Sequence, residues 1–155
     1  MRIKVLFFCL FLVQTSFVLG QKLLPPPPMP VQVAQMLWDS CTAIDYTFFE
    51  LPISMSVDDQ PTIRQNVRHI ALDGILDFAA GCKPIARIFF AKGTSIVLDA
   101  DVYFQQNCTY YMYFKHGENK PIFANKMTQE GLDFFKSVSA QAEQIKKDGK
   151  ISGGH

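Results

Sequence analysis

The chain has 155 residues, and without a predicted leader of twenty residues it has the size of one domain with a single core, which excludes two full domains. Hydrophobic residues make up 48% and charged residues 19%, a balance that excludes a disordered or acidic-tail protein. Loss of Arg2 and Lys4 with the leader lowers Lys plus Arg from 15 to 13 against 14 Asp plus Glu. The resulting net charge of −1 gives no overall attraction toward nucleic acid, so no nucleic-acid partner is expected.

The amino terminus has the layout of a cleavable secretory signal. A short basic segment, Met1 to Lys4, precedes the apolar run Val5 to Val13, and the small residue Gly20 precedes Gln21. The apolar run is too short to span a membrane well. We therefore expect a signal peptide at residues 1–20 and a secreted protein, periplasmic if the source is bacterial and extracellular if it is eukaryotic.

Prolines dominate the next stretch, residues 21–30, where Pro25 to Pro28 are consecutive. Consecutive prolines fix φ and favour the polyproline II conformation, which predicts a semi-rigid spacer before the folded part. The sequence thus predicts a single domain at residues 31–148, followed by a flexible tail at 149–155.

Apolar residues recur at helical spacing in three segments. The first runs from Val31 to Phe49, and the second follows the capping residues before Pro61 and ends near Leu72. The third begins after Thr128, a good N-cap, and ends near Gly149. The residues between Asp73 and Gly81 suit a connector.

Between Cys82 and Met127 the period changes to two, which indicates an antiparallel meander of four strands. If the first loop is Lys92–Thr94 and the second is Gln106–Cys108, Ile88 faces Leu98 and Phe104 faces Tyr110 on the core side. The outer side then pairs Arg87 with Asp99, Tyr103 with Tyr111, Asp101 with Tyr113 and Asp99 with Lys115. The predicted fold class is α+β: two N-terminal helices, a four-stranded antiparallel meander sheet, and one C-terminal helix packed on the sheet.

Three cysteines remain after the leader, so export permits one disulfide. Cys82 precedes the first meander strand and Cys108 opens the third, at the same end of the sheet, which favours the pair Cys82 with Cys108. Cys41 is the alternative partner of Cys82. The triplet Asn107–Thr109 fits the N-glycosylation pattern at a hairpin tip, although a paired Cys108 would disfavour the modification.

Residues suited to catalysis are few. His69, His116 and His155 are not spaced to share a metal or to serve a nucleophile, so no metal or cofactor is expected. Asp99 and Asp101 lie on one strand face, where a hydrolase or lyase would use them with Arg87. The predicted register instead pairs Asp99 with Arg87 and Lys115, as on an ordinary solvated sheet face.

The predicted outer side carries an unusual number of rings: Tyr103, Tyr111 and Tyr113, with Phe123 opposite Tyr113. Clustered tyrosines offer large, rigid contact area with a polar tip. This pattern predicts a small exported, non-enzymatic protein that binds a protein partner or a second copy through its sheet. A helix or the proline-rich segment covering these rings is the equally favoured alternative, and a small secreted hydrolase or lyase is the alternative function.

Overall fold

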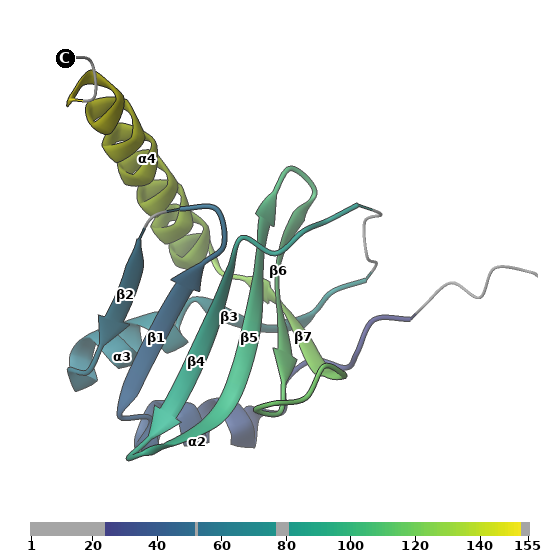
Figure 1. Cartoon of the computed structure of the whole chain (residues 1–155). Helices are drawn as coiled ribbons and strands as arrows, with labels where there is room; N and C mark the ends of the chain where they lie inside the picture. The colour runs from purple at the N-terminus through teal and green to yellow at the C-terminus, as the bar shows by residue number, and fades with distance from the viewer. Residues whose placement is uncertain (1–23, 52, 77–80, 153–155) are drawn as a thin grey trace, which may run out of the picture.

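The computed structural model describes residues 24–51, 53–76 and 81–152. This part of the chain forms one seven-stranded antiparallel sheet with helices behind it in the view of Figure 1. Strand order across the sheet is β2-β1-β4-β5-β6-β7-β3. In chain order the elements are α2 (Val31–Ser40), β1 (Ala43–Phe48), β2 (Ser54–Val57), α3 (Gln60–Val67), β3 (Ile70–Gly74), β4 (Ala86–Lys92), β5 (Ser95–Gln105), β6 (Cys108–Phe114), β7 (Pro121–Met127) and α4 (Gln129–Ser152).

The α+β class, the antiparallel meander and the C-terminal helix on the sheet are confirmed. β4 to β7 pair in sequence order, and β7 has the predicted bounds. Thr128 caps α4 as predicted, because its hydroxyl accepts a hydrogen bond from the Gly131 N–H at 3.2 Å. α4 continues to Ser152, past the predicted end near Gly149, so the predicted tail at 149–155 begins inside a helix.

The predicted count of four strands is wrong, because three further strands lie in segments assigned to helices or connectors. The first helix ends at Ser40, and β1 pairs with both β2 and β4. The second helix ends at Val67, and β3 then pairs with β7 at the far edge of the sheet. In β1, every second residue is buried, namely Ile44, Tyr46 and Phe48. Ile44 and Phe48 are four residues apart and therefore also satisfy helical spacing, which explains the wrong helix prediction.

The predicted register between β5 and β6 is wrong by one residue. Cys108 pairs with Gln105, so the turn contains only Gln106 and Asn107, and Asn107 has a positive φ of 67°. Tyr111 therefore faces Val102, and Tyr113 faces Ala100, both on the side that the helices cover. In the first hairpin, the turn is one residue shorter than predicted and a bulge after Phe90 adds one more residue of shift. The two changes together move the partners by two residues and keep the predicted faces, so Arg87 pairs with Asp101 rather than Asp99.

The hydrophobic core lies between the sheet and the helices. Phe135 of α4 is 1% exposed and its ring contacts those of Phe104 and Tyr111. The Tyr46 hydroxyl donates a hydrogen bond to the Asn66 side chain of α3 at 2.7 Å. These contacts identify the face with Tyr46, Tyr111 and Tyr113 as the core face. In the part of the chain that the structure describes, no helix covers the opposite face of β4, β5 and β6.

The proline-rich segment packs against the sheet, so the expectation of a spacer outside the folded part is wrong for its described residues. The Ala124 N–H donates to the Pro27 carbonyl, and Met29 is 2% exposed in the core. Asn125 is fully buried between this segment and β3: its oxygen accepts the Met29 N–H, and its amide donates to the Ala71 carbonyl, both at 2.9 Å. The segment is thus part of the domain.

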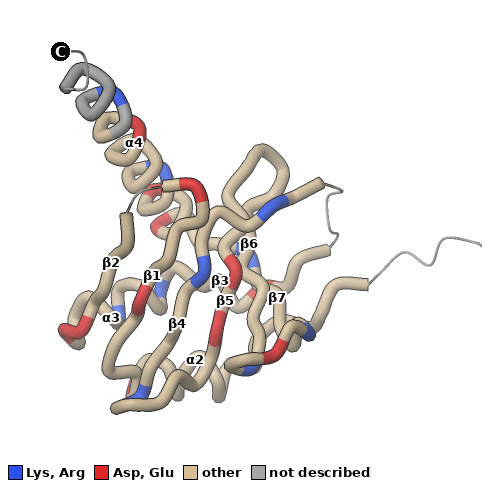
Figure 2. Tube along the Cα trace, in the orientation of Figure 1, with Lys and Arg blue, Asp and Glu red and all other residues tan. Residues whose placement is uncertain are grey.

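Basic and acidic positions are interspersed over the sheet and α4 (Figure 2). The predicted signal peptide lies outside the described residues. Among the helices that the structure describes, none has both the length and the apolar character needed to cross a membrane.

Candidate functional site on the outer face of the sheet

The sheet face opposite the helices carries one Arg–Asp ion pair and one His–Asp contact among aromatic and sulfur-containing side chains. We define this outer face by the residues of β4, β5 and β6 that the register places there: Arg87, Phe89, Asp99, Asp101, Tyr103, Tyr110, Met112 and Phe114. Because the pleat alternates, residues two apart on one strand share this face and lie beside those of the neighbouring strand. The same alternation puts their chain neighbours in the core.

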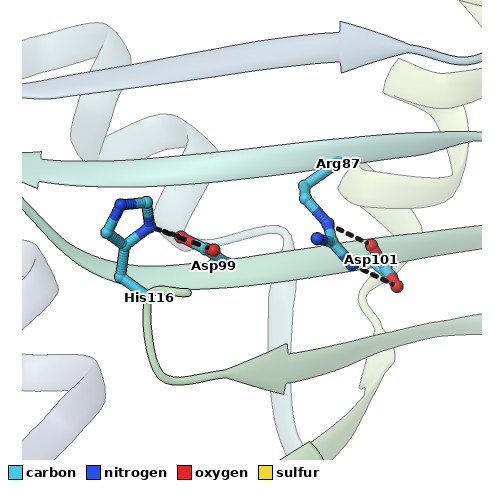
Figure 3. Close-up of polar contacts among 4 residues, drawn as sticks. All are labelled: Arg87, Asp99, Asp101 and His116. Atoms are coloured by element: carbon cyan, nitrogen blue, oxygen red, sulfur yellow. Dashed lines mark hydrogen bonds and ion pairs between the residues drawn. The ribbon is translucent and has the colours of Figure 1, made fainter. Parts of the chain in front are cut away.

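Arg87 and Asp101 form the first pair (Figure 3). They are register partners on β4 and β5, and Arg87 Nε and Nη2 donate to the two carboxylate oxygens at 2.7 and 3.1 Å. The hydrogen bond to Asp101 raises the pKa of the Arg87 guanidinium. The guanidinium carbon also lies 5.4 Å from the ring centroid of Phe114. This two-point contact engages both oxygens of Asp101.

His116 and Asp99 form the second pair. His116 Nδ1 lies 3.0 and 3.1 Å from the two Asp99 oxygens, and the other ring nitrogen points away from the carboxylate (Figure 3). The side chain of Asp99 is 5% exposed, whereas that of His116 is 50% exposed. Phe89 and Phe114 flank Asp99 as its register partners, so the acid lies beneath the histidine and between two rings.

Tyr103 and Tyr110 stack on the outer face beside the first pair. They are register partners, with ring centroids 4.5 Å apart and planes inclined by 19°. Burial raises the pKa of Tyr110 to about 12, and burial, together with the nearby Asp101 carboxylate, raises that of Tyr103. Both hydroxyls therefore stay protonated near neutral pH and act there as hydrogen-bonding groups.

The predicted aromatic surface is split between the two faces. Tyr103 lies on the outer face, but Tyr111 and Tyr113 are 2% and 0% exposed in the core, and Phe123 pairs with Tyr113 on that same side. The one-residue slip at the β5–β6 turn causes this difference. Placing these three rings on the outer face was wrong, and Tyr110, Met112 and Phe114 occupy it instead.

Of the other singled-out residues, Cys108 lies at the end of the outer face, because it shares the alternation of Tyr110 and Met112 on β6, whereas Cys41 and His69 lie in the core. The Cys82–Cys108 disulfide is present, whereas Cys41 is a buried free thiol whose pKa burial raises. Asn107 is exposed at the hairpin tip, where its glycosylation stays a prediction. His69 is 4% exposed in the core, where its ring lies 5.0 Å from that of Phe134, so it does not join the acids.

His116, just beyond β6, also contacts the outer face, and the predicted register did not place it there. The wrong register put Lys115 beside Asp99. With the observed pairing of Asp99 and Phe114, a residue two positions beyond Phe114 falls on the same side as Asp99, and that residue is His116. Correct placement of the turn was thus the missing signal.

Both carboxylates of the outer face already have partners. Both Asp101 oxygens accept hydrogen bonds from Arg87, and both Asp99 oxygens lie within hydrogen-bond distance of His116. Among the described residues, no group of three or more His, Cys, Asp or Glu side chains is arranged to hold a metal ion. Comparisons of the chain with protein-family models, curated proteins and solved structures return no match.

Proposed function

We propose that this chain is a small exported protein without enzymatic activity that binds a protein partner, in an envelope or extracellular assembly, through its outer face. The observation that carries the proposal is a sheet face that no helix among the described residues covers, on which Phe89, Tyr103 and Met112 are half-buried beside the Arg87–Asp101 ion pair and the Asp99–His116 contact. Aromatic residues, Met and Arg are enriched at protein interfaces. Paired acids keep their charges satisfied when a partner removes water from the face.

Export is supported by the basic start and apolar run of the amino-terminal segment. The Cys82–Cys108 disulfide is compatible with an oxidising compartment.

Photo-crosslinking tests the proposed surface. A benzoylphenylalanine at position 89 or 112 would replace a half-buried outer-face side chain, and the same residue at Ile145, which is 50% exposed on α4 at the helix side of the sheet, provides a control. In the compartment where the chain resides, we expect a crosslinked species from positions 89 and 112, and mass spectrometry would show whether it contains a second copy or another protein. No product at these positions, or equal product at Ile145, would contradict the proposal.

A Tyr103→Ser change tests the contribution of the stacked tyrosines. Loss of a tyrosine from a binding hot spot costs about 2 kcal/mol or more of affinity, which corresponds to about a thirtyfold weaker complex. We expect the crosslinked yield at position 89 to fall accordingly. Thr94→Ser, at the exposed β4–β5 turn, is the control and should leave the yield unchanged.

The second candidate is a hydrolase or lyase, and the observation in its favour is the Asp99–His116 pair. A carboxylate that holds one imidazole nitrogen leaves the other nitrogen available as a general base. The sequence suggested that Asp99 or Asp101 would act with Arg87. In the structure, Asp99 contacts His116 instead, and Arg87 pairs with Asp101. Turnover of chromogenic esters, phosphodiesters or glycosides that disappears in both His116→Gln and Asp99→Asn would favour this candidate over the binding protein.

A further inference from the structure

A groove on the helix side of the molecule lies between α2, α3 and β3, away from the outer face. It consists of two adjoining spaces that share Trp38 and Arg68 as walls. The apolar space has a volume of about 190 Å³ and is lined by Val31, Ala34, Val67, Ile70 and Leu72 together with one amide, Gln35. The polar space has a volume of about 490 Å³ and is lined by Pro61, Arg64, Gln65 and Glu130.

Two guanidinium groups define the polar half of the groove. Arg64 and Arg68 are one helical turn apart, and the guanidinium carbon of each lies 5.6 Å from the ring centroid of Trp38. Such cation–π contacts hold the guanidinium groups at the ring and leave their N–H edges available. Within the described part of the chain, neither group has a carboxylate at ion-pair distance, and Glu130 is the one acid that lines the space. The lining therefore has one excess positive charge.

The apolar half has an exposed hydrophobic rim. Val31 of α2 is 59% exposed and Leu72 of β3 is 52% exposed, and both line a space together with the buried Val67 and Ile70. At about 30 Å³ per water, its volume corresponds to roughly six water molecules with few polar partners. An alkyl segment that displaced them would gain about fourfold in affinity for each methylene it buried.

We propose that this groove binds a small anionic amphiphile. Its oxyanion head, a carboxylate or a phosphate, pairs with Arg64 and Arg68, and its single alkyl chain lies against Trp38 and between Val31 and Leu72. Guanidinium forks match the geometry of either oxyanion. The groove and the outer face share no residue, so this site stands independently of the proposed protein-binding function.

Trp38 is the only tryptophan of the chain, so its fluorescence reports on the groove alone. We would titrate the full chain with decanoate below its micelle concentration, and measure the heat of binding in parallel by calorimetry. Hexanoate and octanoate measure the effect of chain length, and decyl phosphate distinguishes the two heads. Decyltrimethylammonium has the same chain with a positive head, and acetate has the head without the chain.

We expect saturable binding of decanoate or decyl phosphate that weakens as the chain shortens, with no saturation by acetate or decyltrimethylammonium. The double variant Arg64→Gln, Arg68→Gln should weaken binding by on the order of tenfold or more, because it removes both charge-assisted contacts. Leu72→Asn should weaken it severalfold. The variant Lys92→Gln, Lys136→Gln makes the same change of charge at exposed sites outside the groove and should bind like the original chain.

Three results would overturn the proposal: no saturation by either anionic probe in both measurements, equal binding of the cationic amphiphile, or unchanged affinity in the double arginine variant. Saturable binding of acidic peptides without binding of the amphiphiles would instead assign the groove to a protein partner. Circular dichroism of each variant confirms the fold. Because Leu72 is half-exposed, its variant still tests the apolar half if the arginine variant fails to fold.

Discussion

Asn125 is the residue whose loss should most directly separate the proline-rich segment from the sheet. Its side chain is fully buried, accepts the Met29 N–H and donates to the Ala71 carbonyl, each at 2.9 Å. Asn125→Ala removes both partners, and each buried group left unsatisfied costs about 1–3 kcal/mol. Water that fills the space left by the shorter side chain relieves part of this cost. We therefore expect the free energy of unfolding to fall by about 2–4 kcal/mol.

Urea denaturation measures this loss, with an unchanged m-value as evidence that both proteins unfold in the same way. Asn119→Ala, in the exposed turn before β7, is the control and should change stability by less than about 0.5 kcal/mol. Met29→Ala also weakens the docked segment, so its effect should be smaller in the Asn125→Ala background than in the original chain. A loss below about 1 kcal/mol for Asn125→Ala, or fully additive effects, would refute the role of Asn125 as the link between the segment and β3.

Three further changes test the packing of the domain. A Cβ on Gly131 would lie 2.9 Å from the His69 carbonyl oxygen, so Gly131→Ala should cost about 1–3 kcal/mol despite its better helix propensity, whereas thermal melts of exposed Ser137→Ala should show little change. Burial lowers the pKa of His69 from 6.5, so the histidine binds a proton more readily in the unfolded chain than in the folded one. The stability that neutral His69 contributes is therefore fully present above about pH 6.5 and is lost as pH falls below that value. His69→Gln should reduce this pH dependence of the free energy of unfolding in urea titrations. Cys82→Ser opens a link between residues 26 apart and should cost about 3–4 kcal/mol, whereas equal stability would exclude a structural role for the disulfide.

The central meander could be predicted because its hydrophobic alternation is local and long. β7 has the predicted bounds, and the Cys82–Cys108 pair followed from the placement of both residues at one end of the sheet. β1 could not be separated from a helix in the same way, because Ile44 and Phe48 satisfy both periods. Its pairing with β4, which joins Ile44 to Phe90 far along the chain, decides between them.

The candidate site was predicted only in part, because a turn shorter by one residue exchanges the two faces of a strand. A loop through Cys108 puts Tyr111 and Tyr113 outside, whereas the observed turn ends at Asn107 and puts both inside. A Gln-Asn pair is a weaker hairpin signal than Asn-Gly, so the sequence did not favour this turn strongly. Arg87, Asp99 and Asp101 lie on the outer face as predicted because the shorter turn and the bulge of the first hairpin each shift the pairing by one residue, and a total shift of two leaves the faces unchanged.

The buried tyrosines provide the sharpest test of this corrected register. Among the described residues, the fully buried Tyr113 hydroxyl has no hydrogen-bond partner, whereas that of Tyr46 donates to Asn66 at 2.7 Å. Tyr113→Phe removes an unsatisfied polar group and should leave stability unchanged or raise it by about 1 kcal/mol, whereas Tyr46→Phe leaves Asn66 without its donor and should cost about 1–3 kcal/mol. Tyr113→Ser would empty a core position and should cost about 3–5 kcal/mol or more, measured by urea denaturation. If Tyr113→Ser instead folds with near-normal stability, the ring lies outside the core, and the outer face must be redrawn with Tyr111 and Tyr113 on it.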